Sequence, residues 1–92
     1  MLKAVTKVTY LEGYKLRLEF NDGVVKDVNL EDELYGPVFE PLRDVELFNK
    51  VAVNPDTNTI EWPNGADLAP EFLYEIGQEL DRIVQATVSQ AG

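Results

Sequence analysis

The sequence contains neither cysteine nor histidine in its 92 residues. Without cysteine, neither a disulfide framework nor a thiolate metal site can form. Without histidine, the chain lacks the residue that most often serves as general base, transition-metal ligand and pH switch. Ser89 is the sole serine, and no glycine-rich loop of the phosphate-binding kind is present. We therefore expect no enzyme activity, no cofactor and no metal.

Long apolar stretches are missing as well. No segment approaches the roughly 18 consecutive apolar residues of a membrane-spanning helix. The first residues also lack the apolar stretch of a secretory signal. We expect a cytoplasmic protein without membrane contact, folded as one domain over residues 1–92, since 45% apolar residues are typical of a globular chain.

Negative charge is abundant and unevenly placed. The net charge is −9, yet residues 1–30 hold five basic and four acidic residues. Residues 31–92 hold three basic and thirteen acidic residues. A negative body repels phosphate backbones, so we expect no direct nucleic-acid binding, and it is complementary to a basic protein partner. A hydrated acidic surface without any partner is the simpler interpretation.

The first third of the chain predicts a three-stranded antiparallel meander. Residues 2–11 form a first strand, although Val5 interrupts its alternation. Residues 14–20 alternate apolar and charged side chains, which is typical of a strand buried on one face. Asp22-Gly23 then predicts a hairpin turn, and residues 24–30 return as the third strand, with Lys26 out of pattern.

The middle of the chain predicts a short helical turn and a hairpin. Asp44 is placed to cap a turn over Val45 to Phe48. Residues 51–53 and 59–62 flank the turn cluster 54–58. The oxygen-bearing residues of this cluster resemble half of a calcium loop, but the central glycine and the final bidentate acid are absent, so a plain β-turn is preferred. These residues are Asn54, Asp56, Asn58 and Glu61.

A long amphipathic helix is predicted for residues 70–88, with Pro70 at its first position. One arc at helical spacing is mostly apolar; it holds Phe72, Leu73, Ile76, Gly77, Leu80, Ile83, Val84, Thr87 and Val88. The distal part of this arc needs a cover, either this chain's own sheet or a second copy, so we expect a homodimer through the C-terminal helix. The predicted fold is α+β.

Four residues are candidates for a partner or ligand contact: Trp62, Asn64, Asp67 and Tyr74. Trp62 supplies a large contact area with a polar nitrogen, and Asn64-Gly65 predicts a tight turn. The structural interpretation of the same segment is a buried Trp62 that fills the junction of sheet and helix. Tyr74 falls on the polar side of the predicted helix.

The densest motif is Trp62-Pro63-Asn64-Gly65-x-Asp67-Leu68-x-Pro70-Glu71. With the strand and turn residues before it, this motif resembles the bacterial family numbered 2442 among the domains of unknown function, over about residues 3–78. The remainder, about residues 79–90, is expected to extend the helix. The resemblance implies a small α+β domain with a mainly antiparallel sheet, and it transfers no catalytic residue. Many members are stand-alone proteins encoded beside another small protein, in an arrangement like toxin–antitoxin pairs. Some relatives carry a C-terminal helix-turn-helix domain; we expect none in this chain and therefore no direct DNA binding.

Three functions follow from these observations. The first is a protein-binding or regulatory module, the antitoxin-like half of a two-gene pair, with a small and preferably basic protein partner. The second is a small-molecule-sensing domain without its own DNA-binding part, which an apolar pocket near Trp62 and Tyr74 would favour. The third is a carboxylate metal site or enzyme.

Overall fold

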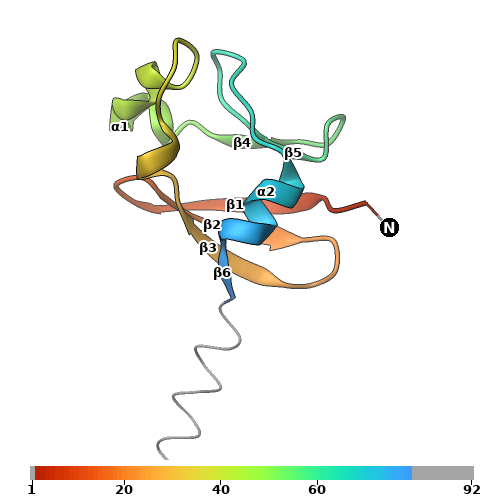
Figure 1. The fold of residues 1–92 in the computed structure, drawn as a ribbon. Helices are drawn as coiled ribbons and strands as arrows, with labels where there is room; N and C mark the ends of the chain where they lie inside the picture. The colour runs from red at the N-terminus through yellow and green to blue at the C-terminus, as the bar shows by residue number, and fades with distance from the viewer. Residues whose placement is uncertain (1, 80–92) are drawn as a thin grey trace, which may run out of the picture.

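The computed structural model describes residues 2–79, which form two layers around one core (Figure 1). A four-stranded antiparallel sheet with the order β1-β2-β3-β6 makes the lower layer. The β4–β5 hairpin, helix α1 and two 3-10 turns make the upper layer, and α2 leads from it down to the sheet. In chain order the elements are β1 Val5–Glu12, β2 Lys15–Phe20, β3 Val25–Asn29, η1 Glu31–Glu33, η2 Glu40–Arg43, α1 Val45–Phe48, β4 Ala52–Asn54, β5 Thr59–Glu61, α2 Pro70–Ile76 and β6 Gln78–Glu79.

The predicted meander is confirmed in strands β1, β2 and β3. Leu16, Leu18 and Phe20 are buried on one face of β2, as their alternation indicated. The turn between β2 and β3 has Gly23 at φ 87°, a conformation that glycine adopts without a steric penalty. The Asp22 carboxylate accepts a hydrogen bond at 3.0 Å from the amide of Val24, the residue just before β3, and so closes the turn.

The irregular alternation of the first strand has a structural cause. The pairing of β1 with β2 shifts between Val5 and Lys7, and again between Tyr10 and Glu12. A β-bulge of this kind adds a residue on one strand and reverses which face the following side chains occupy. Val5 is therefore buried although it is out of phase with the rest of its strand.

The predicted C-terminal helix over residues 70–88 is wrong. Helix α2 begins at Pro70 as expected but ends at Ile76, and Gln78–Glu79 form β6 beside β3. Gly77, at φ −71° and ψ 150°, lies so close to β3 that an added Cβ would stand 2.8 Å from the Lys26 Cβ. Strand pairing at the open edge of β3 thus prevails over the helical spacing of the apolar residues. The reason is that β6 pairs backbone groups on the β3 edge, which a continued helix would leave without a partner.

This correction changes the fold class. The fold is dominated by its sheets, and α2 is the one helix of seven or more residues within 2–79. The residues proposed to form a homodimer, from Leu80 to Val88, lie outside the described residues. The β4–β5 hairpin and the short turn α1 agree with prediction, and the Asp44 carboxylate caps α1 by accepting from the Glu46 amide at 3.0 Å.

Candidate functional site

The segment that follows β5 folds back on that strand as a tight turn. The Gly65 amide donates to the Trp62 carbonyl and the Trp62 amide donates to the Ala66 carbonyl, both at 2.9 Å. Gly65 has φ 90°, which favours glycine at this position. Asp67 then forms an isolated antiparallel bridge with Glu61. The Trp-Pro-Asn-Gly motif is thereby accounted for as the sequence of a turn.

Two side chains of this turn connect it to other parts of the upper layer. The Trp62 side chain is buried, and its Nε1 donates to the Phe48 carbonyl in α1 at 2.8 Å. The Asn64 carboxamide oxygen accepts from the Ala66 amide at 3.1 Å, and its nitrogen donates to the Val38 carbonyl at 2.9 Å. Trp62 and Asn64 therefore position α1 and the loop before η2.

The structure does not gather the four predicted site residues. Trp62, Asn64 and Asp67 share one turn, where Trp62 is buried and Asp67 is exposed without a side-chain hydrogen bond to any residue within 2–79. Tyr74 lies apart on α2, beside the lower sheet. The structural interpretation of Trp62 is thus the one that the geometry supports.

Tyr74 lies in a cluster of charges with Lys3, Lys26 and Asp22. The two lysine Nζ atoms stand 3.9 and 3.8 Å from the centre of the Tyr74 ring, and the Tyr74 hydroxyl donates to Asp22 at 2.8 Å. The hydrogen bond to Asp22 raises the pKa of Tyr74. The pKa of Asp22 falls from 3.8 to about 2, chiefly through the hydrogen bond from the Val24 amide, with Tyr74 and Lys3 adding to it. The cluster holds α2 on the sheet.

Contacts with Tyr74 allow the charged Lys26 side chain to lie on the inner face of β3. Its side chain is 9% exposed, and its Nζ donates to the Tyr74 carbonyl at 2.5 Å. The Tyr74 ring also packs edge-on against Phe20, with 4.9 Å between ring centroids. Neither Trp62 nor Tyr74 is among the residues that line the two cavities described below, so neither cavity is the pocket expected near these residues for a sensing domain.

An apolar groove of about 520 Å³ lies elsewhere in the upper layer. Two segments form its walls, namely Tyr35, Gly36 and Phe39 on one side and Leu68, Ala69 and Phe72 on the other. Glu33 also lines it. Sequence reasoning missed this groove. Tyr35 beside a Gly-Pro pair is a local signal, but a single exposed aromatic residue does not by itself indicate a contact surface.

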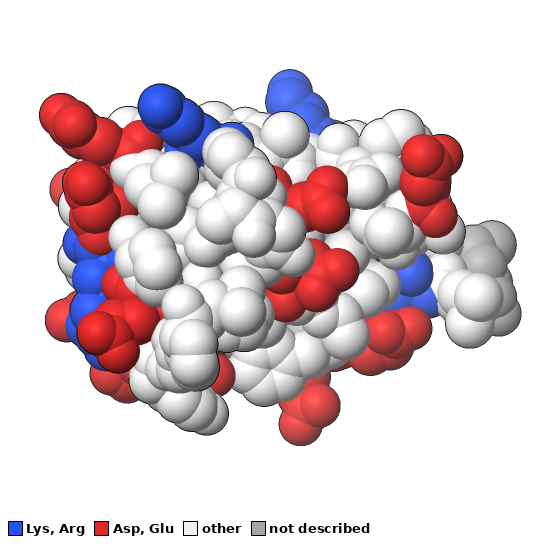
Figure 2. All heavy atoms as spheres, turned by 90° about the horizontal axis from the view of Figure 1, so that it is seen from above, with Lys and Arg blue, Asp and Glu red and all other residues white. Residues whose placement is uncertain are grey.

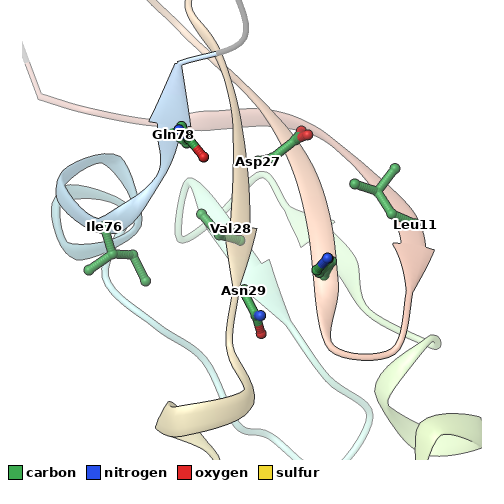
Figure 3. A pocket seen from close by; sticks show the side chains of 7 residues that line it. Leu11, Asp27, Val28, Asn29, Ile76 and Gln78 are labelled. Carbon is green, nitrogen blue, oxygen red and sulfur yellow. The ribbon is translucent and has the colours of Figure 1, made fainter. Parts of the chain in front are cut away.

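A smaller and more polar cavity, of about 320 Å³, lies on the sheet near its β3–β6 edge. In Figure 3, Leu11 lies to one side on β1 and Gln78 to the other on β6, with Asp27 and Asn29 between them on β3. Lys15 lines the same cavity. The lining therefore offers amide, ammonium and carboxylate groups.

The residues that resembled half of a calcium loop form a plain turn between β4 and β5. The Asn54 carboxamide oxygen accepts from the Asp56 amide and its nitrogen donates to Glu61, both at 2.9 Å. Asn58 takes φ 63°, a left-handed turn conformation. Asn54 thus uses its side chain to close the turn. Across residues 2–79, no group of three or more Asp, Glu, His or Cys side chains is placed to hold a metal ion.

Charge pairing differs sharply between the β1–β3 meander and the rest of the described chain. The three ion pairs found within 2–79, Lys3–Asp22, Lys7–Glu19 and Arg17–Asp27, all join residues of the first 27 positions. Positions 31–79 contain twelve acidic and two basic residues, and none of them takes part in an ion pair with a described residue. Figure 2 views the molecule from the upper layer, where acidic side chains outnumber basic ones around uncharged areas.

The family model described as "Protein of unknown function (DUF2442)" matches residues 5–79. The chain belongs to this family. The match ends with β6, so the DUF2442 region coincides with the two layers described above. No curated protein and no solved structure matches the chain.

One observation bears on the membrane. Among the helices of residues 2–79, none has the length and apolar character needed to cross a bilayer. The cytoplasmic location stays a prediction from sequence.

Proposed function

We propose that this DUF2442 protein is a non-catalytic protein-binding module whose partner is a basic protein. The supporting observation is the unpaired negative charge of positions 31–79, which contrasts with the ion-paired meander of the first 30 positions. Exposed charges of one sign steer an oppositely charged protein toward the surface and raise its association rate. An acidic surface needed for solubility alone has no reason to be concentrated after position 30.

The antitoxin-like half of a two-gene pair is the finer form of this proposal. It draws on the family resemblance together with the acidic upper layer. Expression of the neighbouring protein alone should arrest growth, and co-expression of this chain should restore it. Normal growth with the neighbour alone would remove the antitoxin-like role and leave the binding role open.

Affinity capture with charge variants tests the binding proposal. The run Glu31, Asp32 and Glu33 is the densest set of unpaired carboxylates, so Glu31→Gln, Asp32→Asn and Glu33→Gln together form the test variant. We expect wild type to retain a protein of net positive charge in about equal amount. Because the attraction is screened above about 0.1 M salt, that protein should be released as the salt concentration rises, and the variant should retain less of it.

A second variant with the same net charge separates local from overall electrostatics. Glu12→Gln, Asp56→Asn and Glu75→Gln remove three charges at scattered exposed positions. This control should retain the partner better than the test variant. Capture of an acidic partner, binding that is insensitive to salt, or no retained protein at all would each refute the proposal.

The polar cavity supports a second candidate, a domain that senses a small anionic molecule. Lys15 lines this cavity and has no ion pair or hydrogen bond through its ammonium group with any residue in 2–79, which leaves a cation for a ligand. Small carboxylates and phosphates should then raise the thermal midpoint of wild type but not of Lys15→Gln. Equal midpoints for both proteins with every ligand would exclude this candidate.

A further inference from the structure

The apolar groove is a built feature of the upper layer. Its two walls come from segments about thirty positions apart, and each wall is held from behind. The Asn64 side chain donates to the Val38 carbonyl next to Phe39, and the Thr59 hydroxyl donates to the Leu68 carbonyl at 2.6 Å. Phe39 and Leu68 also pack against the buried core. The groove is therefore preorganised, which lowers the entropy cost of filling it.

Apolar surface remains open in this groove. The Tyr35 side chain is 68% exposed, and Phe72 is only partly buried. The volume of about 520 Å³ lies within the range of about 300–1,000 Å³ that is typical of ligand sites, and it accommodates more than one large side chain. An exposed aromatic residue at the edge of an apolar groove is typical of a protein contact.

The segments that contain the two walls carry charge of one sign. Residues 31–42 and 66–76, which supply both walls, contain seven acidic residues and no basic residue. Glu33 lies in the lining itself. An occupant that fits this surface needs apolar side chains for the groove and positive charges for its rim.

We propose that the groove binds a segment of a basic partner protein that inserts two apolar side chains, one helical turn apart, between flanking Lys or Arg residues. This inference rests on the proposed function and adds the place and chemistry of the contact. An amphipathic helix laid in an apolar groove is a common mode of peptide recognition. A second copy of this chain fits poorly, because the like charges of two acidic faces repel each other.

Fluorescence anisotropy with two labelled peptides tests the groove. The probe is a short Lys/Ala peptide with two leucines at i and i+4, and the comparison peptide has the same composition with its leucines on opposite helical faces. The full chain should bind the probe with an apparent Kd below about 100 µM and the comparison peptide about tenfold more weakly. Tyr35→Ala should weaken probe binding about tenfold, and Glu33→Lys should weaken it further.

Two control variants match these changes outside the groove. Val45→Ala removes another exposed apolar side chain, and Asp56→Lys reverses another exposed charge. Each should change the probe affinity by less than about threefold, and thermal midpoints should show that every variant is folded.

The possible failures are distinguishable. Equal, salt-sensitive binding of both peptides would overturn the groove and leave the basic-partner proposal standing. Equal binding by Tyr35→Ala and wild type would likewise overturn the groove. No binding of either peptide would count against both proposals. Light scattering that shows a dimer of the chain alone, dissociated by Tyr35→Ala, would assign the groove to a second copy and overturn the partner segment.

Discussion

Replacing Trp62 by phenylalanine tests whether this side chain holds the Trp-Pro-Asn-Gly turn against α1, a role called the brace below. The indole is buried among core residues, and its Nε1 donates to the Phe48 carbonyl at 2.8 Å. Trp62→Phe keeps an aromatic ring at the site while removing the donor and part of the volume. Any loss of stability therefore reports the brace and its packing.

The expected loss follows from two contributions. The smaller ring leaves about 40 Å³ empty, which at about 24 cal/mol per Å³ costs about 1 kcal/mol. The Phe48 carbonyl keeps only the Val51 amide, at 3.4 Å, and a buried acceptor deprived of its good donor costs about 1–3 kcal/mol. The free energy of unfolding should fall by about 2–4 kcal/mol, out of roughly 5–14 kcal/mol for a chain of 92 residues.

Urea and thermal unfolding followed by far-UV circular dichroism measure this loss, since the variant removes the only tryptophan and with it the fluorescence signal. The thermal midpoint should fall by at least about 8 °C. Tyr35→Phe is the control, because its ring is 68% exposed and the change should stay within about 0.5 kcal/mol. A loss below about 1 kcal/mol for Trp62→Phe would refute the brace.

Three further predictions concern the contacts that shape the fold. Gly77→Ala places a Cβ 2.8 Å from the Lys26 Cβ. Overpacking should cost about 1–3 kcal/mol, and the lower entropy of the unfolded chain offsets about 0.4–1 kcal/mol of this cost. Urea titration should therefore show a net loss of up to about 2.5 kcal/mol, and a gain in stability would contradict the contact. Asp44→Ala removes the cap on the Glu46 amide and should cost about 1 kcal/mol in the same assay, whereas Asp44→Asn, which keeps the acceptor, should cost much less. The pKa of Asp22 is lowered from 3.8 to about 2 in the fold, so the unfolded chain binds more protons between these values, and the stability from ionised Asp22 is present above the upper value and lost as pH falls through the lower one. The difference in unfolding free energy between wild type and Asp22→Asn should therefore shrink as pH falls from about 5 to about 2, and a constant difference would disprove it.

The strands of the meander were predictable because their signals are local. Alternation in β2 and the Asp22-Gly23 turn each depend on neighbouring residues. The β1 bulge and the buried Lys26 were visible only as breaks in the pattern. The first break is explained by the shift in pairing between β1 and β2. The second is explained by the contacts of Lys26 with the Tyr74 carbonyl and ring.

The site was less predictable than the fold. The sequence singled out Trp62 and Asn64, and both matter, but as braces that hold other segments in place. The groove depends on Tyr35 and Phe72, which stand far apart in sequence and meet only through the upper layer. The spacing of apolar residues along the chain cannot predict this contact, because the two walls belong to different segments of the fold.

The sequence by itself determined the meander, the hairpin turns, the start of α2 at Pro70 and the concentration of negative charge after position 30. Each depends on a residue's own conformational preference, its spacing or its charge. The tertiary structure alone decided where α2 ends, because Gly77 must pass close to Lys26 before β6 can pair with β3. It likewise decided which carboxylates remain unpaired, since ion pairing requires two side chains to meet in space.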